Sequence, residues 1–232
     1  MTPSTVVDAA TGKSIDSLIR TSAGTFLDRG QDRVVTAVEQ RIAELTMVPV
    51  ENGEGFQILR YTVGQKYEAH FDYFSDKWNA RPESGGNRVA TLLMYLSDVE
   101  EGGETVFPSS PRPVHQTGDG WSSCAQRGLA VKPRKGDALL FFSLDLKGQL
   151  DSASLHAGCP VIKGTKWSAT KWMHVGCFQC QAAERKKRDA STCADYNANC
   201  AAWALAGECE ANAGFMIGKD GGGDCRKACK AC

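Results

Sequence analysis

The chain has 232 residues, enough for one large domain or for a medium domain with a small appendage. Its formal charge is balanced, with 27 Lys and Arg residues against 27 Asp and Glu residues, so no global field favours nucleic acid or an anionic membrane as a partner. The longest apolar stretch, residues 138–142, is far too short to span a bilayer.

The N-terminal part, residues 1–16, contains no apolar run of the kind found in a signal peptide or an anchor. Residues 31–45 place apolar side chains at helical spacing, which predicts an amphipathic helix. These side chains are Val34, Val35, Val38, Ile42 and Leu45.

From Gly55 onward the pattern changes to short β-type runs separated by Gly, Pro, Asn and Asp. The predicted strands are 56–61, 70–74, 90–96, 104–107, 129–131, 138–143, 155–159 and 167–175. Many short strands with turn residues between them predict a β-sandwich or jelly roll. We therefore expect a mainly β fold with flanking helices.

A change of composition follows the last predicted strand. Residues 181–190 contain the run Glu-Arg-Lys-Lys-Arg and no apolar periodicity, which favours a solvated linker over a nuclear-localisation signal. We place the domain boundary there, with a first domain at 1–180, a basic linker at 181–191 and a small domain at 192–232.

The small domain holds six of the ten cysteines: Cys193, Cys200, Cys209, Cys225, Cys229 and Cys232. Such density predicts a disulfide scaffold in an oxidising compartment, because so short a module cannot bury enough apolar surface to fold without covalent links. A zinc site is the alternative, which these spacings suit poorly. With no export signal in the chain, we expect a targeting segment to precede it.

The other four cysteines lie in the first domain. We expect Cys124 and Cys159 to form a disulfide that ties a loop beside His156. Cys177 and Cys180 have the spacing of a redox motif, but they follow the last strand instead of opening a helix, which favours a structural disulfide or free thiols.

A metal site is indicated by His70 and Asp72, which stand two residues apart in a predicted strand and so project from one face. His156 comes later, in another β-like segment. Two histidines and one carboxylate are the ligands of the facial triad that binds non-haem Fe(II). A surface histidine near an unrelated aspartate is the alternative, which this pattern alone does not exclude.

In the segment after His156, residues with functional side chains alternate with mostly apolar residues. Alternate positions of the run 166–175 would share one strand face, and they hold Lys166, Ser168, Thr170, Trp172 and His174. A lysine at this distance from a metal ligand could pair with the distal carboxylate of a molecule that chelates the metal. The same pattern is also typical of a solvated sheet. Thr91, Leu93 and Tyr95 share a face of strand 90–96, where core packing is an equal interpretation.

Six motifs of residues 4–175 resemble the prolyl 4-hydroxylases of plants and green algae. They are Phe-Gln-Ile-Leu-Arg-Tyr-x-x-x-Gln-Lys-Tyr-Glu-Ala-His-Phe-Asp-Tyr-Phe, Arg-Val-Ala-Thr-Leu-Leu-Met-Tyr-Leu, Glu-Glu-Gly-Gly-Glu-Thr-Val-Phe-Pro, Lys-Pro-Arg-Lys-Gly-Asp-Ala-Leu-Leu-Phe-Phe, Ser-Leu-His-Ala-Gly-Cys-Pro-Val and Lys-Trp-Ser-Ala-Thr-Lys-Trp-Met-His-Val. They occur in the family order, with family-like spacing. The strand and helix that precede the Ser-x-Val-Val-Asp region in the family are absent here.

The resemblance implies a double-stranded β-helix and the hydroxylation of peptidyl proline at C-4, of the procollagen-proline type. O2 and 2-oxoglutarate would be cosubstrates of Fe(II), giving 4-hydroxyproline, succinate and CO2, with ascorbate as a further requirement. The substrate would be a proline-rich, cell-wall-type protein in polyproline II conformation. The location implied is the lumen of the endoplasmic reticulum or Golgi, with a membrane anchor N-terminal to this chain.

The resemblance also implies roles for individual residues. His70, Asp72 and His156 would bind iron. For 2-oxoglutarate, Lys166 would bind the C-5 carboxylate, assisted by Tyr61 and Thr105, while Leu93, Tyr95 and Trp172 would line or close the pocket. Tyr67, Arg88 and His174 would bind the peptide. Arg88 has the opposite strand parity to Thr91, so we expect it at the entrance of its strand.

The C-terminal cysteine pattern resembles the ShK-toxin-like domain of many plant and algal prolyl hydroxylases. This resemblance implies the pairs Cys193–Cys232, Cys200–Cys225 and Cys209–Cys229, and a role in recognition or stability. Three other functions stay open: a cupin-like binding module without chemistry, an oxygenase acting on another residue, and a protein whose tail is the functional unit.

Overall fold

A computed structural model of the chain describes residues 1–7, 14–16, 19–110, 116, 120–180, 193–197, 199–218 and 223–232. The chain divides into two compact units, Met1–Phe178 and Gln179–Cys232. The predicted linker, 181–191, lies outside the described residues.

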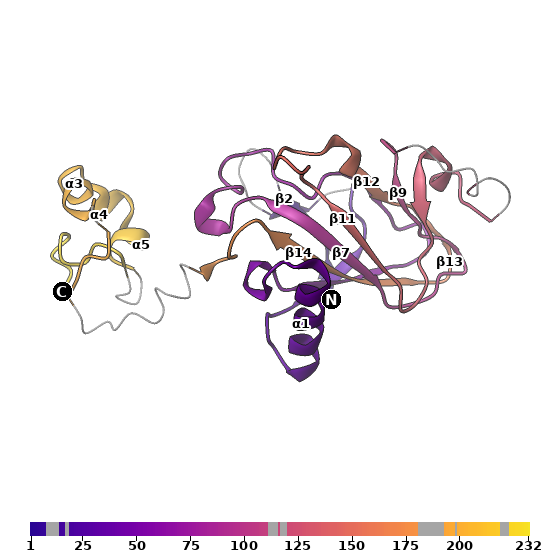
Figure 1. Cartoon of the computed structure of the whole chain (residues 1–232), viewed down its shortest axis with the longest axis horizontal. Coiled ribbons are helices and arrows are strands. Elements are labelled where there is room, and N and C mark those ends of the chain that lie inside the picture. Colours follow the sequence, from indigo (N-terminus) through magenta and orange to yellow (C-terminus); the bar gives the residue numbers. More distant parts are fainter. Residues whose placement is uncertain are drawn as a thin grey trace. The chain divides into compact units, whose positions relative to one another are not determined.

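The larger unit contains a six-stranded antiparallel sheet with the strand order β1-β4-β5-β14-β7-β11. Its strands are β1 (Thr2–Pro3), β4 (Ala23–Leu27), β5 (Phe56–Tyr61), β14 (Lys166–His174), β7 (Arg88–Tyr95) and β11 (Ala138–Phe142). The two longest strands, β7 and β14, run side by side within the sheet (Figure 1).

A second sheet has the order β10-β9-β12-β6. Its strands are β10 (Leu129–Val131), β9 (Thr105–Phe107), β12 (His156–Gly158) and β6 (Tyr67–His70). Two short ladders join β13 (Val161–Lys163) to β8 (Glu101–Gly102) and β2 (Thr5–Val7) to β3 (Ser14–Asp16). Short 3-10 helices include Val50–Asn52, Pro82–Ser84, Ala125–Arg127 and Ser152–Ser154. The result is a mainly β, jelly-roll-like fold, which confirms the predicted fold class.

The six-stranded sheet has two different faces, as the alternation of side chains along a strand requires. On one face, Leu92 and Met173 pack against Val35 and Ile42 of helix α1 (Arg33–Thr46), and Figure 1 shows this helix beside β14. On the other face, β7 and β14 turn alternate side chains into a cavity: Thr91, Leu93, Lys166, Ser168, Thr170 and Trp172. One face therefore builds the core and the other builds a site.

Helix α1 begins at a capping residue, Asp32, whose carboxylate accepts from the backbone N–H groups of Val34 and Val35 at 2.8 and 2.9 Å. The predicted helix, 31–45, matches α1 apart from its ends. The predicted apolar face is partly wrong, since Val34 and Leu45 are exposed while Glu39 is buried. Glu39 can be buried because Lys171 on β14 donates to its Oε1 at 2.6 Å.

Most of the predicted strands are present, but one of them is misplaced and several short strands were not predicted. The predicted strand 70–74 is wrong in position, because β6 ends at His70 and leaves Asp72 outside the ladder. Strands β1 to β4, β8 and β13 were not predicted, because their runs are short and show no clear alternation.

The smaller unit is held by the disulfides Cys193–Cys232, Cys200–Cys225 and Cys209–Cys229, the three pairs that the resemblance implies. Because these six sulfur atoms are oxidised, the alternative of a zinc site is excluded. Its helices are α3 (Cys200–Leu205), α4 (Glu208–Ala211) and α5 (Ala213–Met216). Trp203 and Phe215 pack edge to face beside the disulfides, with ring centroids 5.7 Å apart.

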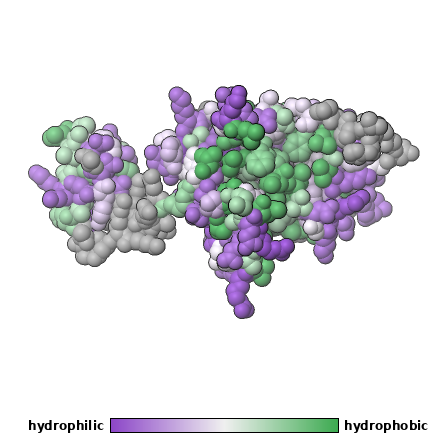
Figure 2. All heavy atoms as spheres, viewed as in Figure 1, coloured by the Kyte–Doolittle hydropathy of each residue, from purple (hydrophilic) through white to green (hydrophobic). Residues whose placement is uncertain are grey.

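The surface of the larger unit carries apolar side chains as well as charged ones. Figure 2 shows apolar side chains gathered over β7 and β11 on the face that is viewed. Among the helices in the described part of the chain, none combines the length and the apolar composition that crossing a bilayer requires.

Candidate metal and cosubstrate site

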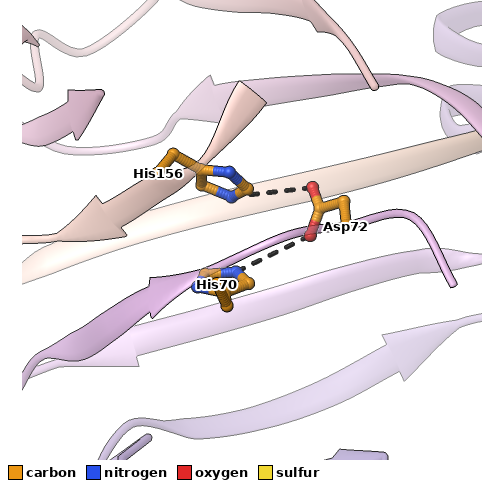
Figure 3. Close-up of side chains that lie close together, drawn as sticks. All are labelled: His70, Asp72 and His156. Atoms are coloured by element: carbon orange, nitrogen blue, oxygen red, sulfur yellow. Dashed lines mark ion pairs between the residues drawn. The ribbon is translucent and has the colours of Figure 1, made fainter. Parts of the chain in front are cut away.

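Two histidines and one aspartate converge in the larger unit. His70 ends β6 and His156 begins β12, and the two residues are direct partners in the ladder between these strands. Their Nε2 atoms lie 3.6 and 3.7 Å from the two carboxylate oxygens of Asp72. Figure 3 shows the carboxylate beside both imidazole rings. One ligand atom of each residue lies within 4.8 Å of the other two.

The other nitrogen of each ring is bonded to the backbone. Nδ1 of His70 donates to the carbonyl of Glu68 at 2.8 Å, and Nδ1 of His156 donates to the carbonyl of Ser154 at 2.9 Å. These bonds leave the Nε2 lone pairs for another partner. Burial, reinforced by the neighbouring His156, lowers the pKa of His70 to about 3, which keeps the ring neutral.

The carboxylate of Asp72 is buried and held by Thr91, whose Oγ1 donates to Oδ2 at 2.6 Å. Burial alone would raise the pKa of Asp72, but His156, His70 and Arg88, together with the bond from Thr91, lower it to about 2. Two imidazoles with free Nε2 atoms and one ionised carboxylate are a donor set that fits Fe(II) and leaves three positions for other ligands.

Aromatic rings surround the three residues. His156 lies against Phe141 and Phe107, with ring centroids 4.6 and 5.8 Å away. The ring of Tyr67 stacks on His70 at 3.6 Å. These rings lower the local dielectric, which strengthens any electrostatic interaction inside the site.

Lys166 lines the same cavity and is buried. Its Nζ donates to the carbonyl of Gly103 at 2.7 Å and lies 5.7 and 5.5 Å from the ring centroids of Tyr61 and Tyr95. Burial lowers the pKa of Lys166 to about 8, while the nearby Glu104 opposes this change. The cavity therefore offers a cation whose charge has little compensation from the protein.

Most other residues predicted to bind 2-oxoglutarate line this cavity: Tyr61, Leu93, Thr105 and Trp172. Tyr95 lies behind the wall, where its hydroxyl donates to Oγ1 of Thr105 at 2.9 Å. The indole Nε1 of Trp172 is buried without a hydrogen-bond partner among the described residues. Because an unpaired buried donor is costly, this N–H is available to a ligand in the cavity.

The residues predicted to bind a peptide lie in different places. Tyr67 lines the cavity. Arg88 begins β7, as its strand parity suggested. Its Nε donates to Oε1 of Glu54 at 2.6 Å, and its guanidinium lies 4.1 Å from the ring centroid of Trp172.

His174, the third residue predicted to bind a peptide, is buried beneath the surface of the larger unit. This side chain is 1% exposed, with Nδ1 2.8 Å from the carbonyl of Gly86 and Nε2 2.9 Å from Oε1 of Glu54. Phe178 stacks over the ring at 4.7 Å. Both nitrogens are therefore engaged and the ring is covered.

Two residues of this region were not predicted. Arg20 lines the cavity, with Nη2 donating to Oε1 of Gln57 at 2.6 Å and the guanidinium 4.6 Å from the ring centroid of Tyr67. An isolated β-bridge to Tyr67 places it there, and no sequence motif indicates such a bridge. Glu54 binds both Arg88 and His174. Its burial would raise its pKa, yet these partners lower it to about 2.

A disulfide joins Cys124 to Cys159, as expected, and so anchors the chain just after β12, which begins with His156. Cys177 and Cys180 are also disulfide-bonded, so the alternative of free thiols is excluded. All ten cysteines of the chain are oxidised.

Comparisons with known proteins agree with this site. A sequence profile of the 2OG-Fe(II) oxygenase superfamily matches residues 56–174. "Probable prolyl 4-hydroxylase 7" of Arabidopsis thaliana is 53% identical over 231 residues, which are 99% of this chain and 71% of that protein. "Prolyl 4-hydroxylase 2" of the same organism is 49% identical over 234 residues, covering 99% of this chain and 76% of that protein.

A solved structure is similar as well. It is a viral collagen prolyl hydroxylase from Paramecium Bursaria Chlorella virus-1 in complex with 2OG, with 30% sequence identity and a TM-score of 0.52. The match covers 66% of this chain and 78% of that chain. On the profile match and the Arabidopsis relatives, the chain belongs to the 2OG-Fe(II) oxygenase superfamily and, within it, to the prolyl 4-hydroxylases.

Proposed function

We propose that this protein hydroxylates C-4 of peptidyl proline in proline-rich, cell-wall-type proteins, using O2 and 2-oxoglutarate and giving 4-hydroxyproline, succinate and CO2. The observation that carries the proposal is the convergence of His70, Asp72 and His156 in one cavity with Lys166, in a chain of this family.

His70, Asp72 and His156 would hold Fe(II), which supplies the redox chemistry when bound. The protein contributes the arrangement around it. The bonds from the Nδ1 atoms to Glu68 and Ser154 hold the two rings in one tautomer and one orientation. The aromatic rings around His156 lower the local dielectric.

Lys166 would bind the C-5 carboxylate of 2-oxoglutarate through a charge-assisted hydrogen bond. Tyr61 and Thr105 would assist it, Leu93 and Trp172 would complete the pocket, and Tyr95 would hold Thr105 from behind the wall. The unpaired indole N–H of Trp172 supports this assignment, since the cavity then offers a neutral donor as well as a cation.

The peptide would approach past Tyr67 and Arg88 in polyproline II conformation, which aromatic surfaces bind at low entropic cost. Phe71 and Tyr73 support this proposal, because they flank Asp72 in the chain and their ring centroids lie 4.5 Å apart. Phe71 is also partly exposed.

We also propose a domain boundary near Cys180, with residues 192–232 forming an ShK-like domain that recognises a partner or only adds stability. The lumen of the endoplasmic reticulum or Golgi is the proposed location, with membrane attachment through an anchor N-terminal to this chain. Ten oxidised cysteines support an oxidising compartment. Ascorbate would sustain activity by restoring enzyme that has lost its ferrous state.

The test is hydroxyproline formation on a proline-rich peptide with Fe(II), 2-oxoglutarate and ascorbate, comparing the parent protein with His156→Ala. We expect hydroxyproline from the parent alone. Succinate with a hydroxyl group on another residue would overturn the proline assignment. No turnover by a folded, iron-loaded parent would favour a binding module.

A further inference from the structure

Asp72 differs from the two histidines in how the fold holds it. His70 and His156 are fixed by the ladder between β6 and β12, where they are direct partners. Asp72 comes after the end of β6, in a bend without ladder bonds. Strand geometry therefore positions two of the three ligands, and the position of the carboxylate needs another cause.

Side chains from β7 and the residue before it provide that cause. Thr91, in the middle of β7, donates from Oγ1 to Oδ2 of Asp72 at 2.6 Å. Thr91 is 1% exposed, and its strand neighbours are Trp172 on β14 and Phe141 on β11. Because its backbone is held in the sheet from both sides, its hydroxyl is a rigid donor to the carboxylate.

Asn87 holds the chain two residues beyond Asp72. The backbone N–H of Phe74 donates to Oδ1 of Asn87 at 2.8 Å, and Nδ2 of Asn87 donates to the carbonyl of Phe74 at 2.8 Å. This pair of bonds satisfies both backbone groups of Phe74, as a partner strand would. The amide of Asn87 thus replaces a ladder where the strand has ended.

Arg88 adds a third contact to the same segment. Its Nη1 donates to the backbone carbonyl of Asp72 at 3.3 Å, and its guanidinium lies 4.7 Å from the ring centroid of Phe74. Arg88 itself is oriented by Glu54, which accepts from its Nε. The backbone and the side chain of Asp72 are therefore held from the same strand.

We propose that Asn87, Arg88 and Thr91 form a clamp that sets the position of Asp72 as a metal ligand. They are positioning residues, because none of them belongs to the His70, Asp72 and His156 cluster. This inference rests on the metal role proposed for that cluster, and it extends that role by naming what fixes the carboxylate. Without the clamp, the two histidines remain in place while the carboxylate samples other positions.

The clamp is tested by Co(II) binding, measured by calorimetry and by the ligand-field absorption spectrum, which need no turnover. The informative variants are Asn87→Ala, which removes both bonds to Phe74, and Thr91→Val, which removes the hydroxyl without changing the shape. Thr91→Ser is the rescue variant because it keeps the hydroxyl. We expect the first two to weaken Co(II) binding about tenfold or more and Thr91→Ser to stay near the parent.

Ser97→Ala is the matched control. Just beyond the other end of β7, Ser97 accepts from the backbone N–H of Trp167 at 2.8 Å and donates to the carbonyl of Thr165 at 2.9 Å. This variant also loses two bonds to the backbone, but far along the strand from Asp72. We expect it to bind Co(II) as the parent does.

Several results would overturn the clamp. One is parental Co(II) affinity and spectrum in Asn87→Ala and Thr91→Val, and another is an equal loss in Ser97→Ala. If Asn87→Ala does not fold by circular dichroism, the Thr91→Val and Thr91→Ser pair decides. Asp72→Ala distinguishes failure of the clamp from failure of the proposed metal site. If this variant binds Co(II) like the parent, the metal assignment itself fails.

Discussion

The two units of this protein reach a stable structure by different means. The larger unit joins a six-stranded sheet, a four-stranded sheet and helix α1, and its Cys124–Cys159 disulfide lies just after β12. In the smaller unit, the described helices α3, α4 and α5 have four to six residues each, and the disulfides Cys193–Cys232, Cys200–Cys225 and Cys209–Cys229 join its parts. A short module buries too little apolar surface for a stable core, so disulfides supply the stability that the core lacks.

The two interiors also differ in the size of their apolar clusters. The larger unit combines a cluster that includes Val35, Ile42, Phe56 and Met173 with buried polar contacts, such as the Lys171–Glu39 ion pair and the Asp72–Thr91 hydrogen bond. The smaller unit also buries two charged residues, Asp224 and Arg226, but its buried apolar cluster consists of two cysteines and Met216. A preorganised polar site needs a large, ordered scaffold around it, and the larger unit provides one.

The largest effect is expected from removing one disulfide of the smaller unit. Replacing both Cys200 and Cys225 by alanine removes the disulfide at the centre of its core, a loss of about 2–5 kcal/mol that a small module cannot sustain. We expect this unit to unfold and become protease-sensitive, while the larger unit keeps its proline hydroxylation within about twofold. Limited proteolysis with mass spectrometry checks the first part and a hydroxylation assay the second. Loss of hydroxylation would contradict independent roles.

Removing the Cys124–Cys159 disulfide from the larger unit should disturb its folding less. The Cys124–Cys159 disulfide closes a loop with a sequence separation of 35, for which loop entropy predicts a contribution of about 3–4 kcal/mol. We expect the Cys124→Ala, Cys159→Ala variant to have a lower urea midpoint yet to stay folded at 25 °C, because the sheets supply most of the stability. Ser123→Ala is the exposed neighbouring control. Complete unfolding in buffer would show that this unit depends on its disulfide as the smaller one does.

The smallest effect concerns the charge of Lys166. Burial lowers its pKa to about 8, so the cation is present below pH 8 and is lost as the pH rises above that value. The affinity for 2-oxoglutarate should therefore fall about tenfold per pH unit above 8, as calorimetry with Mn(II) in place of Fe(II) can measure. Lys166→Arg stays charged and should give a flat profile. A flat profile in the parent, or a sloping one in the arginine variant, would refute this role.

The sequence alone predicts the parts of this protein that depend on local pattern. Helix α1, most strands of the larger unit and the jelly-roll-like class follow from periodicity and turn residues. The motifs around His70, Asp72 and His156 pointed to the residues that cluster, because their spacing is specific to a family of sites.

Features that depend on distant partners were not predictable. Glu39 was not expected inside, since its partner Lys171 stands far away in the chain. Arg20 enters the cavity through an isolated bridge that leaves no periodic signal. Strand alternation correctly paired Asp72 with His70, but its reasoning was incomplete. Asp72 lies beyond the end of the strand, and side chains from another strand hold it in place.

The most direct test of the proposed activity uses isotopically labelled O2 with a proline-rich peptide, Fe(II) and 2-oxoglutarate, followed by mass spectrometry and amino-acid analysis. We expect one labelled oxygen atom on C-4 of a proline residue and the other in succinate, and we expect His156→Ala to form neither labelled product. Labelled succinate with a hydroxyl group on another residue, or hydroxyproline formed equally by His156→Ala, would contradict it.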